Sequence, residues 1–141
     1  MSAPSINGVG HIDLTVRDAE RSVRWWEQVM GFKLVNISEH EGGRKGYGML
    51  HPCGLPVILQ QHAHTATERF DEQAIGLDHL AFRVPDRETL EAWASHLDTL
   101  GIAHSGIQEE NGGPLIVFRD PDNIQLEVWA HDPARVTMNQ G

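Results

Sequence analysis

Two histidines, one glutamate and one glutamine stand at comparable places in the two halves of this 141-residue chain. His11 and His79 are 68 positions apart, Glu127 comes 48 residues after His79, and Gln60 comes 49 residues after His11. Two imidazoles and a carboxylate are a usual ligand set for a divalent metal ion with open coordination positions. We therefore predict a site for Fe, Mn, Ni, Zn or Co on His11, His79 and Glu127. Gln60 is a candidate fourth ligand, although a neutral amide could instead hydrogen-bond a substrate.

A lone histidine on a strand is more often structural than a metal ligand, so the prediction depends on the repetition around it. The residue pairs that recur with the 68-position offset are Gly8/Gly76, His11/His79, Val16/Val84, Asp18/Asp86, Glu20/Glu88 and Trp25/Trp93. A fixed period of half the chain indicates a duplicated module. Within a single domain spanning 1–141, we predict a first module at 6–63, a linker at 64–75, a second module at 76–131 and a tail at 132–141.

Apolar periodicity places these residues on regular elements. In the first module it predicts a strand at 8–17, a helix from the Asp18 cap to about residue 30, and strands at 32–37, 46–51 and 57–62. In the second module it predicts a strand at 79–84, a helix at 86–100, a short strand at 102–105, and a hairpin of 114–119 with 123–129. His11 and Asp13 then lie on the polar face of the first strand, opposite Ile12, Leu14 and Val16.

Each half is thus a strand, a helix and three strands, which predicts an α+β fold. One helix on a four-stranded sheet covers only one face of that sheet. Two tandem βαβββ modules side by side can form an open, mixed, eight-stranded, barrel-like cup with the helices outside. In that arrangement the face that carries both histidines lines the cup.

Composition excludes several classes of function. A net charge of −9 and a pI near 5.3, without basic clusters, make nucleic acid an unlikely partner. No apolar run approaches the roughly 20 residues needed to span a membrane, and the first residues lack the pattern of a signal peptide. A lone cysteine, Cys53, suits a reducing compartment, so we expect a cytoplasmic protein.

These residues resemble the vicinal oxygen chelate superfamily: glyoxalases, extradiol dioxygenases, methylmalonyl-CoA epimerases, fosfomycin-resistance transferases and bleomycin-binding proteins. The carriers are Gly8-Val9-Gly10-His11-Ile12, Trp25-Trp26 through Gly31-Phe32, Gly76-Leu77-Asp78-His79-Leu80, and Phe118 through Glu127, together covering about residues 6 to 131. The resemblance implies the paired-module cup and a metal on His11, His79 and Glu127. It also implies a small-molecule substrate and a homodimer, in which modules of two chains sometimes build one cup.

The departures from that pattern separate the branches of the superfamily. Four-ligand glyoxalases often have a charged glutamate at the place of Gln60, and the His/Gln/His/Glu set looks more like that of the epimerases. Extradiol dioxygenases share the His/His/Glu set but are usually about twice this length. Bleomycin-type binding proteins generally lack the ligands.

Further candidates follow from the same faces. His62 could replace Gln60 as a ligand or act as a base, and Trp129 could form either the cup wall or a dimer contact. Tyr47 is expected near the cup rim. Asp13 lies on the same face as the predicted ligands and could orient one of these side chains by a hydrogen bond.

Three functions remain open at this point. The first is a divalent-metal-dependent lyase, isomerase or epimerase that acts next to a carbonyl, with the substrate chelated through its oxygens and Glu127 moving the proton. The second is an extradiol-type ring-cleaving dioxygenase. The third is a metal-free binding protein that sequesters a small molecule, as bleomycin-resistance proteins do.

Overall fold

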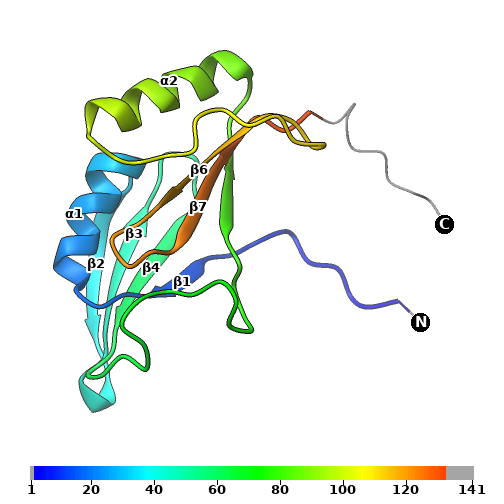
Figure 1. Ribbon diagram of the computed structural model, residues 1–141. Helices are drawn as coiled ribbons and strands as arrows, with labels where there is room; N and C mark the ends of the chain where they lie inside the picture. The colour runs from blue at the N-terminus through cyan, green and yellow to red at the C-terminus, as the bar shows by residue number, and fades with distance from the viewer. Residues whose placement is uncertain (1, 133–141) are drawn as a thin grey trace. The chain divides into compact units, whose positions relative to one another are not determined.

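The computed structural model describes residues 2–132, and the chain divides into two compact units, Met1–Glu68 and Arg69–Gly141 (Figure 1). All but the first residue of the predicted tail at 132–141 lies outside the described residues. Across residues 2–132, no helix is long and apolar enough to cross a membrane.

The first unit contains one helix and a four-stranded mixed sheet. Its elements are β1 (Ile12–Thr15), α1 (Ala19–Met30), β2 (Lys33–Glu39), the short 3-10 helix η1 (Glu41–Gly43), β3 (Lys45–Leu50) and β4 (Pro56–Gln61). The strand order is β1-β4-β3-β2, with β1 parallel to β4 and the other pairs antiparallel. This arrangement is the βαβββ module predicted for the first half.

The second unit repeats that topology with one strand fewer. Its elements are β5 (Leu80–Arg83), α2 (Arg87–Thr99), β6 (Leu115–Arg119) and β7 (Gln125–Trp129). The strand order is β5-β7-β6, again with the first strand parallel to the last and the neighbouring pair antiparallel. The α+β class is therefore confirmed, with sheets of four and three strands.

The short strand predicted at 102–105 is wrong. That stretch and the residues after it make only two isolated bridges to β6, His104 with Phe118 and Gln108 with Leu115. Between them, the Val117 backbone N–H donates to the Ser105 hydroxyl at 2.9 Å instead of to a backbone carbonyl. The side chain interrupts the backbone ladder, so residues 2–132 contain seven strands. The eight-stranded cup that would join the two units remains a prediction.

Both helices begin where their cap residues predict. The Asp18 side chain accepts the Arg21 backbone N–H at 3.2 Å, and the Asp86 side chain accepts the Thr89 backbone N–H at 2.8 Å. Hydrogen bonds from Thr89 hold the pKa of the Asp86 carboxyl below its ordinary value, because they favour its charged form. Gly31 ends α1 in the left-handed conformation, at φ 76°.

The strand register gives each sheet one apolar and one polar face. In the first unit, α1 lies against β2, β3 and β4 (Figure 1), and Leu14, Leu59 and Tyr47 form one row of the sheet. The opposite face carries Thr15 and Gln60, which are paired across β1 and β4. We call this the polar face of the first unit.

The second unit follows the same rule. Leu126, Val128 and Phe118 are buried beneath α2, which contacts β6 and β7. The opposite face of the sheet carries Glu127 and Trp129 of β7. We call this the polar face of the second unit.

Candidate functional site

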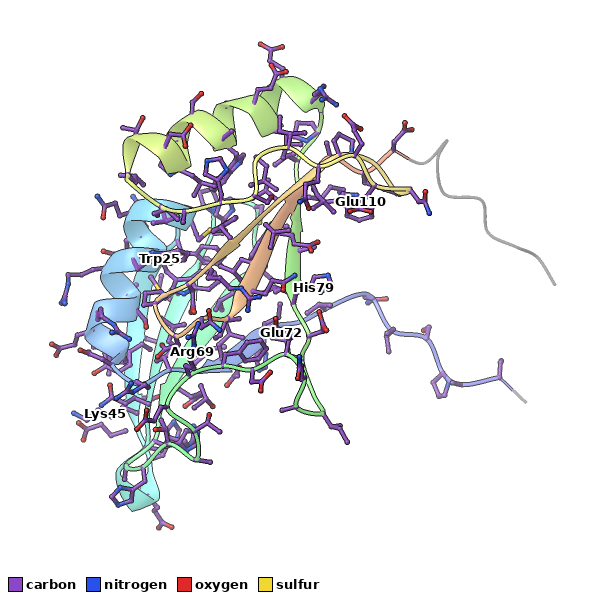
Figure 2. All side chains as sticks on the ribbon, viewed as in Figure 1. Trp25, Lys45, Arg69, Glu72, His79 and Glu110 are labelled. Carbon is purple, nitrogen blue, oxygen red and sulfur yellow. The ribbon has the colours of Figure 1, made fainter. Side chains whose placement is uncertain are left out.

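The structure brings His79 and Glu127 together in the second unit. His79, labelled in Figure 2, directly precedes β5. Glu127 lies on β7 opposite Ala81, so the two side chains lie on the polar face of the second unit. His79 Nε2 lies 3.5 Å from Glu127 Oε2. The Glu127 side chain is 12% exposed, whereas that of His79 is 39% exposed. An imidazole nitrogen therefore faces a nearly buried carboxylate.

Asp78 orients the imidazole from its other side, a role that our sequence reasoning missed. Its Oδ1 lies 2.7 Å from His79 Nδ1. A carboxylate that accepts the Nδ1 proton fixes the tautomer and leaves Nε2 as a lone-pair donor, as behind many metal-binding histidines. The sequence feature that could have revealed this role is an acidic residue directly before the second histidine. The first half has Gly10 at the corresponding position.

Arg119 and Gln125 approach Glu127 from the same sheet face. Arg119 Nη2 donates to Gln125 Oε1 at 3.1 Å, and Gln125 Nε2 donates to Glu127 Oε1 at a long 3.4 Å. Because a guanidinium can only donate, Arg119 fixes the amide with its oxygen toward Arg119 and its NH₂ toward the glutamate. This Arg–Gln–carboxylate relay presents a hydrogen-bond donor to one oxygen of Glu127 and leaves the other facing His79.

Glu72, labelled in Figure 2, neutralises Arg119. Its two carboxylate oxygens accept from Nη1 and Nη2 at 2.9 and 2.8 Å, which is the bidentate geometry that a guanidinium favours. The hydrogen bonds from Arg119 lower the pKa of Glu72 to about 2 from its ordinary 4.5. The segment around Phe70 is bound to the β6–β7 turn as well, since the Phe70 backbone N–H donates to the Asp122 carbonyl at 2.8 Å.

The polar face of the first unit carries a second relay of the same kind. Arg44 Nη1 donates to Gln60 Oε1 at 2.6 Å, and Gln60 Nε2 donates to Asp13 Oδ2 at 2.8 Å. Asp13 Oδ1 in turn lies 3.3 Å from His11 Nε2. Each unit therefore holds an arginine, a glutamine, a carboxylate and a histidine in sequence, although the residues come from different positions in the two modules.

The register corrects the equivalence that we drew by counting residues. In the second unit Ala81 pairs with Glu127, and in the first unit Asp13, its counterpart at the 68-position offset, pairs with Ile58. Ile58 rather than Gln60 therefore occupies the place of Glu127. Gln60 pairs with Thr15 and corresponds to Trp129, which pairs with Arg83. In the first unit, Asp13 of β1 supplies the carboxylate that faces the histidine.

The remaining candidates are distributed differently from the prediction. Tyr47 is 7% exposed and shares its row with Leu59, so its side chain lies on the helix-covered face of the sheet, and its place near the cup rim stays a prediction. His62 is exposed and directly follows β4. Trp129 lies on the polar face of the second unit, where its ring packs 4.5 Å from that of His131.

Side chains of the types that ligate metals occur as facing pairs within each unit. Over residues 2–132, no group of three His, Cys, Asp or Glu side chains that could hold a metal ion is present. The pairs are His11 with Asp13 and His79 with Glu127.

Comparisons with known proteins agree with this fold. Residues 8–128 match the family model described as the Glyoxalase/Bleomycin resistance protein/Dioxygenase superfamily, and the chain belongs to that superfamily. A solved domain from Frankia sp. EAN1pec, described as a glyoxylase/bleomycin resistance protein/dioxygenase domain, is 34% identical. The match covers 91% of this chain and 100% of the Frankia domain, with a TM-score of 0.84.

Two further relatives carry more specific names. Catechol-2,3-dioxygenase of Bacillus subtilis (strain 168) is 27% identical over 126 residues, which cover 89% of this chain but 42% of the relative. The chain thus spans about two fifths of the length of the curated relatives it matches. A structure of the fosfomycin resistance protein FosX from Listeria monocytogenes, complexed with Mn(II) and sulfate, is 20% identical and covers 93% and 98% of the two chains, with a TM-score of 0.67. That likeness shows the fold.

Proposed function

We propose that this protein is a divalent-metal-dependent enzyme that binds a small molecule through adjacent oxygens and acts next to a carbonyl, as a lyase, isomerase or epimerase. The observation that carries the proposal is the facing pair of His79 Nε2 and Glu127 Oε2, 3.5 Å apart. Membership of the superfamily and the Mn(II) in the FosX structure support it.

The pair fits a metal ion in both spacing and chemistry. Two ligand atoms at about 2.1 Å from one metal, at angles between about 90° and 110°, lie roughly 3.0–3.4 Å apart. The observed separation of 3.5 Å is close to that range. Asp78 holds the imidazole at Nδ1, with Nε2 turned to the glutamate. A proton on Nδ1 leaves the lone pair on Nε2, and this is the tautomer that a metal bound at Nε2 requires.

Electrostatics favour a cation at the same place. A nearly buried carboxylate is stable when it is paired with positive charge or well hydrogen-bonded. In the described residues, Glu127 is met by an amide at 3.4 Å and a histidine at 3.5 Å. A divalent ion, when bound, would supply the missing positive charge and stabilise negative charge that develops on a chelated substrate oxygen.

We propose that His11 completes the set and that Gln60 is not a ligand. Gln60 Oε1, the atom that would bind a metal, already accepts a hydrogen bond from Arg44 at 2.6 Å. Asp13, which faces His11, is available either to orient that ring or to accept a proton from the substrate. We assign the principal proton transfer to Glu127, because its carboxylate is nearly buried and its Oε2 faces the imidazole at 3.5 Å.

Metal content per chain tests this proposal. We would measure it by mass spectrometry after reconstitution with each first-row metal, for the wild type, His79→Ala, Glu127→Gln and the control His64→Ala, an exposed histidine outside both pairs. We expect about one metal per chain in the wild type and the control, and loss in the other two variants. An unloaded wild type would contradict the proposal and leave the metal-free binding protein.

A ring-cleaving dioxygenase is the second candidate. The similarity to a catechol-2,3-dioxygenase favours it. The register favours it as well, because Ile58, which cannot bind a metal, stands where the second unit has its glutamate, and this leaves the His/His/Glu set that extradiol dioxygenases share. Oxygen uptake by the Fe(II)-loaded protein with catechol separates the two reactions. Uptake assigns ring cleavage, whereas solvent deuterium incorporated next to a carbonyl, observed by NMR without oxygen uptake, assigns the isomerase-type chemistry.

We further propose that the protein is a homodimer. Val35 and Ile37 of the edge strand β2 are 62% and 54% exposed, an apolar edge that a second copy would cover. Analytical ultracentrifugation tests the dimer. Mixing His11→Ala with His79→Ala subunits tests where the ligands combine: metal binding returns in the mixed dimer if one site draws on two chains, and stays absent if each chain builds its own site.

A further inference from the structure

Arg44 differs from the other ordered cations near the two polar faces because it lacks an acidic partner. Its Nη1 donates to the neutral Gln60 Oε1 at 2.6 Å, and no carboxylate of residues 2–132 forms an ion pair with it. By contrast, neighbouring Lys45 pairs with Glu39 at 3.1 Å, and Arg119, its counterpart in the other relay, pairs with Glu72 at 2.8 Å.

The backbone and one glycine hold Arg44 in this place. The His40 backbone N–H donates to the Arg44 carbonyl at 2.8 Å, which closes the turn around η1 just before β3. Gly46 then pairs with Gln60, and a Cβ at Gly46 would lie only 3.3 Å from both Gln60 amide heteroatoms. The glycine therefore lets the Gln60 amide lie close over the sheet, between Arg44 and Asp13.

The chemistry of this guanidinium selects an oxyanion. Arginine has five N–H donors in a planar fork that matches carboxylate and phosphoryl groups, and a half-buried charge is stabilised by a counter-charge. An unpaired, half-buried arginine is notable in a chain with a net charge of −9. Its side chain is already ordered by Gln60, so less conformational entropy is lost when an anion binds.

We propose that Arg44 is an anion-binding subsite and that the substrate carries a carboxylate or phosphoryl group in addition to the oxygens that chelate the metal. Naming this ligand a substrate rests on the proposed function above. The position follows from the relay, in which Gln60 links Arg44 to Asp13 and Asp13 faces His11. The Gln60 amide also separates the bound anion from the Asp13 carboxylate.

Arg83 is the competing cation. It lies on the polar face of the second unit, level with Trp129, and forms no ion pair within the described residues. Its side chain is exposed and has no hydrogen bond that would order it among those residues. Binding an anion there would cost more side-chain entropy than at Arg44, so Arg83 serves as a control.

The test uses the full-length, metal-free chain, so that it does not depend on metal binding. Arginine Nε–H and glutamine side-chain signals are followed by NMR during titration with phenylphosphonate, benzoate and the neutral benzyl alcohol. We expect saturable shifts at Arg44 and Gln60 with one or both anions and none with the alcohol. Which anion binds more tightly identifies the charged group.

Matched variants decide whether Arg44 is responsible. Arg44→Gln should weaken binding of the preferred anion at least about tenfold, the effect of losing a hydrogen bond to a charged group; Arg44→Lys should show an intermediate loss. Lys45→Gln and Arg83→Gln should bind as the wild type does, and backbone spectra verify that each variant folds. Absence of saturable shifts in the wild type, or loss in Arg83→Gln instead, would overturn the proposal. Anion binding by a chain that never takes up metal would overturn the enzyme proposal alone.

Discussion

At the scale of single residues, the site depends on side chains that act through one another. The carboxylate of Glu127 is positioned by Gln125, which Arg119 orients. The corresponding relay in the first unit runs from Arg44 through Gln60 to Asp13. Substituting the arginine or the glutamine of either relay should therefore change the site without altering a proposed ligand.

Asp78 gives the sharpest residue-scale prediction. Asp78→Asn removes the carboxylate that holds His79 Nδ1 at 2.7 Å. Metal affinity should fall by about 10- to 100-fold, as for other groups that orient a metal-binding histidine. Competition with a fluorescent chelator measures this loss. Asp71→Asn, an exposed aspartate of the same unit that accepts the Gln73 backbone N–H, should leave the affinity unchanged.

At the scale of elements, the turn of the β6–β7 hairpin joins its two strands and also binds the segment before β5. Asn123 adopts the left-handed conformation at φ 70°, as its place in the Asp-Pro-Asp-Asn turn predicts. Its side-chain amide also donates to the Phe70 carbonyl at 3.0 Å. The turn thereby anchors the segment that carries Glu72, whose partner Arg119 begins the relay to Glu127.

Asn123→Val should destabilise the protein more than Asn123→Gly does. Both variants lose the bond to Phe70, but only valine is strained at a positive φ, at a cost of about 1–2 kcal/mol. The free energy of unfolding, measured in urea, should differ between the variants by that amount. Equal stabilities would show that the turn adopts another conformation.

The Glu72–Arg119 pair should make stability depend on pH. The folded pKa of Glu72, about 2, lies below its ordinary 4.5, so the pair stabilises the fold above pH 4.5 and loses this effect as the pH falls toward 2. The difference in melting temperature between the wild type and Glu72→Gln should be largest near neutral pH and should shrink below 4.5. Glu110→Gln, which changes an exposed glutamate, should show no such trend.

At the scale of the whole molecule, two units with the same topology each hold one histidine that faces a carboxylate. A metal ion that binds the folded chain and not the unfolded chain stabilises the fold by mass action. A metal at 100 times its dissociation constant adds about 2.7 kcal/mol. The melting temperature of the wild type should rise with metal and fall again with a chelator, and that of His79→Ala should not respond.

The sequence by itself determined the duplication, the α+β class, both helix starts, and the meeting of His79 with Glu127. These features depend on local hydrogen bonds, on periods of two or 3.6 residues, and on a repeat that is visible in the order of the residues. Only the tertiary structure decided that Ile58 matches Glu127, that Tyr47 faces the helix, that Asp78 contacts His79, and that an arginine begins each relay. Strand register depends on pairing across loops of unequal length, so a shift of one or two residues escapes a count along the chain. Arginine side chains reach partners many positions away, and that reach leaves no periodic signal.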